Sequence, residues 1–288
     1  MKISKLRALF FAATLALGLG HTTVNAAALI SPFVVGGVNT IEDLNAERVL
    51  RNGLAVTSGA FQEGDIIQSI LRFTGFNSQS IGDFLPAPYQ LNAIVELQIA
   101  AILDTGVDAG GGFGNLFRLV FTPSGNLGAN VFASLYERTS VAQAALNFND
   151  AALTSIAKIQ AQTLIAQLGL SEADDFWGST VINNIGVIAG AAVGSPQAAS
   201  GEFGLTLLSN AGGISYVTNG IASGLTGTLH DAVGSSSIFA RSTGTNSEWI
   251  ASSNTDVSFA SIPEPATLAL LGLGLLGMGA SLRKRKSV

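Results

Sequence analysis

The sequence predicts a mainly β fold: a sandwich-like antiparallel ectodomain with one or two added helices, followed by a single C-terminal transmembrane helix. Two observations predict the β domain. Short apolar runs alternate with turn residues, and most of the 34 glycines lie between residues 27 and 262. Such runs, bounded by Gly, Ser, Thr and Asn, form strands and turns rather than helical bundles. A long uncharged run near the C-terminus predicts the transmembrane helix.

The expected strands follow one another along this middle region. Residues 131–136 alternate with period two, which indicates a strand with two different faces. Residues 65–73 do not alternate cleanly, so that strand is expected to be bulged or buried on both faces. The full set is Leu29–Val35, Leu54–Thr57, Asp65–Phe73, Ala93–Asp104, Leu116–Phe121, Asn130–Tyr136, Glu202–Leu208, Ile214–Val217, Ser237–Ala240 and Thr255–Ala260.

One long helix is expected among these strands. Asn149 is a residue type that favours the N-cap position, and Gly169 lies where a helix-ending glycine would. Between them, up to Leu168, apolar residues recur at helical spacing on one stripe. A second helix over Ile41–Leu50 is a weaker expectation.

We expect a single domain over residues 27–262, because no linker or charge block divides this region. It holds seven of the 14 basic residues and 18 of the 19 acidic ones, so its formal charge is −11, against −5 for the whole chain. An acidic domain repels phosphate backbones, which argues against nucleic-acid binding. The chain has no cysteine, which excludes thiol catalysis and cysteine-ligated zinc.

Residues 1–26 have the three parts of a secretory signal peptide. Lys2, Lys5 and Arg7 form a positive start, and an apolar, uncharged run follows over residues 8–19. Small residues then allow cleavage after Ala26 or Ala28. The apolar run is too short for a stable membrane span. The sequence therefore predicts export, with signal peptidase as a processing partner.

Residues 263–288 predict a membrane anchor of unusual composition. Residues 266–282 carry no charge and, as a helix, extend about 26 Å, just enough for the hydrocarbon core of a bilayer. The basic tail over residues 283–288 should stay in the cytoplasm by the positive-inside rule. Its charged residues are Arg283, Lys284, Arg285 and Lys286.

A kinked tripeptide, Pro263-Glu264-Pro265, precedes the apolar run. Each proline lacks an N–H and fixes φ, so the backbone around Glu264 stays extended, as a protease requires. The order of tripeptide, short glycine-rich apolar helix and basic cluster resembles the PEP-CTERM sorting signal of Gram-negative bacteria. This resemblance covers residues 262–288. It implies that an exosortase cuts near the tripeptide after transient anchoring in the inner membrane, and that the mature protein reaches the cell surface or extracellular matrix.

The leading functional hypothesis is a structural or adhesive protein of a biofilm or exopolysaccharide, not an enzyme. The sorting signal and the lack of a recognisable catalytic motif motivate it. A carbohydrate-binding module is the alternative, and a secreted glycan hydrolase is a further one, since its paired carboxylates would leave no local spacing. Trp177 and Trp249 could stack on sugars, but with so few aromatic residues we expect them mostly in the core.

The segment between Asp104 and Asn115 is the best candidate for a cation site, and calcium is the only cofactor considered. Asp104, Asp108 and Asn115 supply oxygen ligands, and the intervening glycines free backbone carbonyls to turn inward. The spacing departs from an EF-hand, and a plain strand connection is the alternative interpretation.

The single histidine of the middle region, His230, gives little support to hydrolysis. It lies beside Asp231, but no G-x-S-x-G turn accompanies it, and one imidazole cannot build a zinc site. We expect His230 to belong to the polar surface. The acidic residues Glu172, Asp174 and Asp175 are expected to form a solvated turn, with calcium binding as the alternative.

Overall fold

The structure, a computed structural model, describes residues 37–57, 59–80, 82, 87–109, 114–182, 199–214, 216–240 and 248–261. In these ranges twelve strands form one large sheet, two form the ribbon β11 (Ile221–Ala222) and β12 (Leu229–His230), and the helix α3 (Ala152–Gln160) is described in full. The strands of the large sheet are β1 (Gly37–Arg51), β2 (Leu54–Val56), β3 (Ile66–Phe76), β4 (Gln79–Ser80), β5 (Gln90–Asp108), β6 (Asn115–Pro123), β7 (Val131–Arg138), β8 (Thr163–Gly169), β9 (Phe176–Ile182), β10 (Ala199–Ser209), β13 (Ala232–Ala240) and β14 (Ala251–Ser261).

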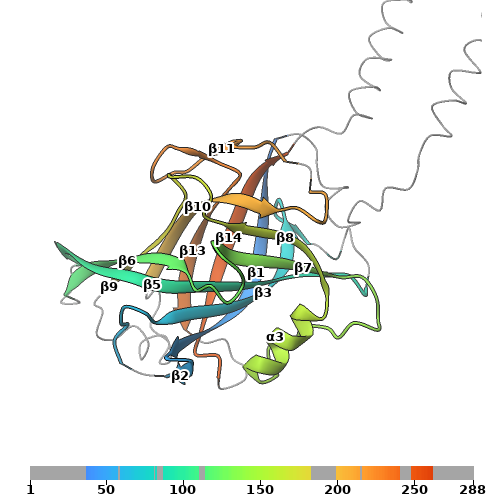
Figure 1. Ribbon diagram of the computed structural model, residues 1–288, viewed down its shortest axis with the longest axis horizontal. Coiled ribbons are helices and arrows are strands. Elements are labelled where there is room, and N and C mark those ends of the chain that lie inside the picture. The colour runs from blue at the N-terminus through green and yellow to red at the C-terminus, as the bar shows by residue number, and fades with distance from the viewer. Residues whose placement is uncertain are drawn as a thin grey trace, which may run out of the picture.

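The large sheet closes on itself. Its strands run in the order β3, β1, β14, β13, β10, β8, β7 and β5, and β5 then pairs with β3 from Ile66↔Gln98 to Arg72↔Asn92. All these pairs are antiparallel, and Figure 1 shows them wrapping around a common interior. The predicted mainly β, antiparallel fold is confirmed. The sandwich-like arrangement is not: the strands form one continuous ring rather than two facing sheets.

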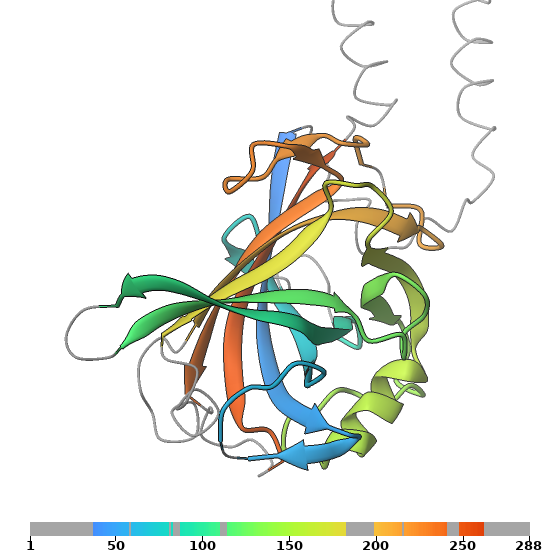
Figure 2. The ribbon, with the colours of Figure 1, turned by 60° about the vertical axis from the view of Figure 1, so that its left-hand side comes forward.

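Two long strands change partners halfway along. β5 pairs with β7 over residues 90–95 and with β6 from Leu97 to Asp108, whereas β10 pairs with β9 over residues 199–204 and with β8 beyond. The sheet therefore has β7 and β8 in its wall at one end and β6 and β9 at the other. Figure 2 shows β5 and β6, in green, projecting beyond the ring. We call the projecting part, residues 103–108 and 114–118, the arm.

A second apolar cluster lies outside the ring, where α3 covers the sheet. Ile156 and Ile159 of the helix pack with Ala46, Ile70 and Ile94 of β1, β3 and β5. Figure 1 shows α3 beside the sheet. Glu248 binds the N-terminal end of this helix, because the Ala152 N–H donates to its Oε2 at 2.7 Å. A carboxylate at this end also complements the helix dipole.

Both predicted helices need correction. The helix expected from Asn149 to Leu168 spans only Ala152–Gln160, and its last third is the strand β8. β8 fills the space between β7 and β10, and hydrogen bonding to both strands outweighs the helical spacing of its leucines. The helix expected over Ile41–Leu50 is part of β1.

Most expected strands are confirmed, with boundaries shifted by a few residues. The described residues of Ile214–Val217 form no strand, and β8, β9 and the ribbon were not predicted. The expected strand Leu29–Val35, the signal peptide and the sorting segment 263–288 lie outside the described residues. In the part of the chain that the structure describes, no helix is long and apolar enough to cross a membrane.

Candidate functional site

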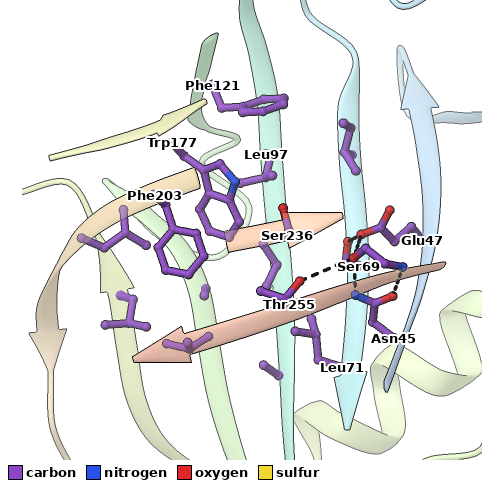
Figure 3. A pocket seen from close by; sticks show the side chains of 18 of the residues that line it. Asn45, Glu47, Ser69, Leu71, Leu97, Phe121, Trp177, Phe203, Ser236 and Thr255 are labelled. Carbon is purple, nitrogen blue, oxygen red and sulfur yellow. Dashed lines mark hydrogen bonds between the residues drawn. The ribbon is translucent and has the colours of Figure 1, made fainter. Parts of the chain in front are cut away.

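The ring encloses an interior cavity of about 70 Å³. Most of its wall is apolar and comes from facing strands, with Leu97 on β5, Phe121 on β6, Trp177 on β9 and Phe203 on β10 (Figure 3). The rings of Trp177 and Phe203 pack with centroids 4.4 Å apart. At about 15 Å³ for each water-sized group, the cavity has room for roughly five such groups.

One side of the cavity is polar. Asn45 and Glu47 of β1, Ser69 of β3, and Ser253 and Thr255 of β14 line it together. Ser253 Oγ donates to Glu47 Oε1 at 2.7 Å, Ser69 Oγ donates to the same oxygen at 3.1 Å, and Asn45 Nδ2 donates to Ser253 Oγ. Figure 3 shows this cluster opposite the aromatic wall. The cavity thus has an apolar body and one hydrogen-bonding face.

Glu47 is the titratable group of this face. Burial raises the pKa of its carboxyl, and the hydrogen bonds from Ser253 and Ser69 oppose that rise. Its carboxyl oxygens accept hydrogen bonds from Ser253 and Ser69 and are placed to accept one from a bound hydroxyl or amide. The cavity therefore suits an uncharged ligand with one polar group.

Next to this cluster the hydrogen-bonded ladder of β1 and β14 is interrupted. The ladder stops at Ile41↔Val257 and resumes at Glu47↔Ala251. Across the gap, the Thr255 N–H donates to Asp43 Oδ1 at 2.7 Å, and the Ser253 N–H donates to Asn45 Oδ1. The two side chains take the place of backbone acceptors, as buried N–H groups require. We call this interruption the split.

A groove of about 680 Å³ lies at the split. Three carboxylates line it, those of Glu42, Asp43 and Asp256, together with the Phe148 ring. Its lining includes no basic side chain; the other residues are Leu44, Asn45, Thr74, Ser252, Ser253 and Asn254. Because Asn45 and Ser253 line the interior cavity as well, the split joins the groove to the cavity's polar face.

Asp43 is the most perturbed acid of the groove. Only 5% of its surface is exposed. Burial raises its pKa to about 7, and the charges of Glu47 and Asp256 add to the rise, while hydrogen bonds from the Thr255 N–H and Asn45 oppose it. Its Oδ1 has the Thr255 N–H as partner, but its buried Oδ2 has none. The pKa of Asp256 is also raised, by burial and by Glu42.

Asp43 and Glu47 were not among the residues predicted from the sequence to form a site. A signal exists in retrospect: polar residues occupy positions 43, 45 and 47, every second residue of one strand, and so share its inward face. Such a polar stripe is read as a strand only once the neighbouring elements are known.

The expectation that His230 belongs to the polar surface is wrong. His230 is 1% exposed and packs edge-on against Phe176. Its Nε2 lies 2.8 Å from Thr228 Oγ1, and its Nδ1 lies 3.3 Å from Asp175 Oδ1. Thr228, His230 and Asp175 thus stand in the order of a hydroxyl, a base and an orienting acid.

The turn expected to be solvated is also held in place, through Asp175. Its Oδ2 accepts hydrogen bonds from the N–H groups of Ser171 and Glu172 and from Thr206 Oγ1, at 2.7–2.8 Å. Asp175 therefore ties the turn after β8 to β10 and to His230. A carboxylate saturated in this way stabilises a loop, and this is the role that its contacts describe.

The three residues expected to hold calcium lie together on the arm. Asn115 Nδ2 donates to both carboxylate oxygens of Asp104 at 3.1 Å, and Asp108 faces Asn115 in the ladder. The Gly106 N–H donates to Asp104 Oδ1 as well. Among the described residues no three His, Cys, Asp or Glu side chains are grouped to hold a metal ion. Calcium binding here stays a prediction.

Both tryptophans are buried, Trp177 in the cavity wall and Trp249 beneath α3. Neither ring offers an open face on which a surface-bound sugar could stack. The sorting residues Pro263, Glu264 and Pro265 and the basic residues 283–286 lie outside the described residues.

A family model for the PEP-CTERM protein-sorting motif matches residues 261–286. No curated protein and no solved structure matches the chain. The match confirms the resemblance drawn from the tripeptide, the apolar run and the basic tail. A chain with this motif is a substrate of an exosortase and is exported to the cell envelope or surface after processing at the membrane.

Proposed function

We propose that the sorting motif delivers the domain formed by the closed sheet, and that this domain works outside the cell as a binding protein, without catalysis. Its ligand is a small, largely apolar molecule with one hydrogen-bonding group, held in the interior cavity. The observation that carries this proposal is the interior cavity, in which a largely apolar wall faces a polar cluster centred on Glu47. Closed sheets of about eight strands are wide enough inside for one small ligand.

The lining defines the chemical class of this ligand. Leu97, Phe121 and Trp177 favour an apolar body, because transfer of apolar surface from water is favourable. A carboxyl with a raised pKa disfavours an anion, whose burial beside it would be costly. An alcohol or an amide satisfies both conditions, with its polar group directed to Glu47 and Ser253.

Short linear alcohols from ethanol to 1-butanol, which has five non-hydrogen atoms, test this proposal. Replacement of Trp249 by Phe leaves Trp177 as the sole tryptophan, and Trp249 Nε1 has no hydrogen-bond partner to lose. We expect saturable changes in Trp177 fluorescence with the alcohols. Ala133, in the cavity wall, provides the matched pair: Ala133→Leu should fill the cavity and abolish binding, whereas Ala133→Gly should retain it. Binding that survives Ala133→Leu would contradict the proposal.

A structural or adhesive role in a biofilm or exopolysaccharide is a second candidate, and the arm favours it. Leu103 and Val107 are 50% and 54% exposed on the arm. Exposed apolar side chains on a projecting strand pair are suited to contact with another surface. We expect Leu103→Ser with Val107→Ser to lower flocculation of the producing cells, and Leu229→Ser, equally exposed but away from the arm, to leave it unchanged. Flocculation equal to that of the parent strain in both variants would argue against adhesion through the arm.

Sorting by the motif has a direct test. Replacement of Pro263, Glu264 and Pro265 by alanine should leave the protein in the inner membrane at its precursor mass. Mass spectrometry of the membrane and surface fractions measures this outcome and locates both processing sites. Surface delivery of the triple variant at mature mass would show that the tripeptide does not direct cleavage.

The proposal that the protein is not an enzyme rests on the burial of His230, which leaves its Nε2 accessible only to Thr228. Assays with ester and glycoside substrates provide the check. Turnover that is lost in His230→Gln or Asp175→Asn would identify the protein as a hydrolase.

A further inference from the structure

We propose that the groove at the split binds a primary ammonium group, which Asp43 holds through its unpartnered carboxylate oxygen. This site adjoins the polar face of the interior cavity, with which it shares Asn45 and Ser253, but Asp43 itself lines only the groove. The site would recognise a small organic cation, and the cation would seal the interruption between β1 and β14.

The first argument is the state of Asp43. Its side chain is anchored, because Oδ1 accepts from the Thr255 N–H, while Oδ2 is buried without a hydrogen-bond partner and lines the groove. A buried acceptor without a partner is destabilising, and more so when it is charged. A ligand in the groove that donates to Oδ2 would supply the missing partner of an acceptor whose side chain is already held by the Thr255 N–H.

The second argument is the charge around it. The ionisable groups that act on Asp43 are Glu47 on its own strand and Asp256 on β14, and both are acidic. Burial and the charge of Glu42 in turn raise the pKa of Asp256. Arg72 of β3 lies on a neighbouring strand, with its guanidinium 5.4 Å from the centre of the Phe148 ring, and is not part of the groove lining. The lining of the groove therefore has three acidic side chains and no basic one.

The third argument decides between a metal ion and an organic cation. No three acidic side chains of the described residues are grouped closely enough to hold a metal ion, and calcium takes six to eight oxygen ligands. The groove, at about 680 Å³, is also far larger than a bare ion needs. An ammonium has only three donors, which Asp43 Oδ2, Asp256 and a neighbouring side-chain oxygen can accept. The edge of the Phe148 ring provides an apolar wall for the attached carbon chain.

Binding should be coupled to the ionisation of Asp43. At neutral pH its carboxyl is partly protonated, because burial raises its pKa to about 7. An ammonium ligand favours the ionised form, so the affinity should increase as pH rises from 5 to 8. Ionisation of Glu47 and Asp256 would strengthen binding of the ammonium in the same way.

Propylammonium chloride is the probe, and N-propylacetamide, its neutral acetylated form, is the matched control ligand. Isothermal titration of the purified full chain at pH 8 should give saturable binding of propylammonium and affinity at least tenfold weaker for the amide. Asp43→Asn, which keeps the oxygen that accepts from the Thr255 N–H, should weaken propylammonium binding at least tenfold. Asp174→Asn removes the same charge at an exposed turn and should leave binding unchanged.

Circular dichroism of both variants shows whether the fold is intact, and Asp256→Asn gives a second groove variant, with an expected loss of about threefold or more. Three outcomes would overturn the proposal. The parent chain could show no saturable binding, Asp174→Asn could weaken binding as much as Asp43→Asn, or calcium chloride could displace propylammonium at stoichiometric concentration. The last result would identify a metal site instead.

Discussion

Replacement of Asp43 by asparagine should stabilise the protein at pH 8 and have little effect at pH 4. Asparagine has the same shape and retains an oxygen for the Thr255 N–H, so the variant removes only the ionisable group. The pKa of Asp43 rises from 3.8 to about 7 on folding, mainly through burial. At 1.36 kcal/mol per pKa unit, that rise of about three makes the ionised residue roughly 4 kcal/mol less favourable in the folded protein.

The sign follows from where protons are bound. Between pH 4 and pH 7 the folded protein holds a proton on Asp43 that the unfolded chain has released. Stability therefore decreases as pH rises through this window, and the full penalty is present above pH 7. The asparagine variant has no such penalty. The hydrogen bond from the Thr255 N–H is already included in the folded pKa of about 7, so the expected net gain at pH 8 is the whole penalty of roughly 4 kcal/mol.

Urea unfolding followed by circular dichroism, at pH 4 and pH 8, measures both values. For a domain of this size a gain of roughly 4 kcal/mol corresponds to a rise in Tm of roughly 8–16 °C. Asp174→Asn, at an exposed turn, is the control and should change stability by less than about 0.5 kcal/mol. A stability difference between Asp43→Asn and the parent that is the same at both pH values would refute the reasoning, as would a variant that is less stable at pH 8.

Two further predictions concern packing in the closed sheet, and urea unfolding tests both. Gly204→Ala would place a Cβ 2.4 Å from the buried ring of His230, so we expect a loss of about 2–3 kcal/mol, whereas Gly178→Ala meets its first neighbour at 3.6 Å and should cost less than about 0.5 kcal/mol. Similar losses of stability in the two alanine variants would show that the His230 imidazole moves aside at little cost. Asp65 is 1% exposed and accepts two hydrogen bonds of 2.7 Å from Arg51, so Asp65→Asn should lower the free energy of unfolding by about 2 kcal/mol, and an unchanged value would mean that this pair contributes nothing.

Most strands could be predicted from the sequence because turn residues separate them. The strand β1 could not. Its inward face carries Asp43, Asn45 and Glu47, so the apolar alternation that marks a half-buried strand is absent. What remains is Ile41 and Leu44 at a spacing of three among charged residues, which is typical of a weak amphipathic helix. The prediction failed because polar side chains occupy the inward face of this strand, where apolar ones are usual.

The overlong helix failed for a different reason. Thr163–Gly169 continues the helical spacing of leucines, and Gly169 matches a helix end. In the structure this stretch hydrogen-bonds on both edges, to β7 and to β10. Gln162, just before it, donates to the Ala144 carbonyl and accepts from Asn92 Nδ2, which fixes the change of direction. Because these partners are distant in the chain, the local helix and strand propensities do not indicate them.

The candidate site was beyond reach of sequence reasoning for the same reason. His230 and Asp175 are 55 residues apart, and Asn45 and Ser253 are 208 apart. Pairing of distant strands, not local sequence, brings each of these pairs together. The sorting motif, in contrast, is contiguous, and its match to residues 261–286 confirms what the tripeptide and its flanks predicted.

The split is a costly way to close a sheet. Backbone hydrogen bonds from β1 would satisfy Ser253 and Thr255 without burying any acid, and threonine or valine at position 43 would suit a strand better. Instead the protein buries Asp43 beside Glu47, and both pKa values are raised by that burial. Perturbed acids concentrate where a protein binds or reacts, because stability alone would replace them. Since the described residues place both acids along one interruption that joins the outer groove to the interior cavity, this part of the wall is where ligand chemistry is best sought.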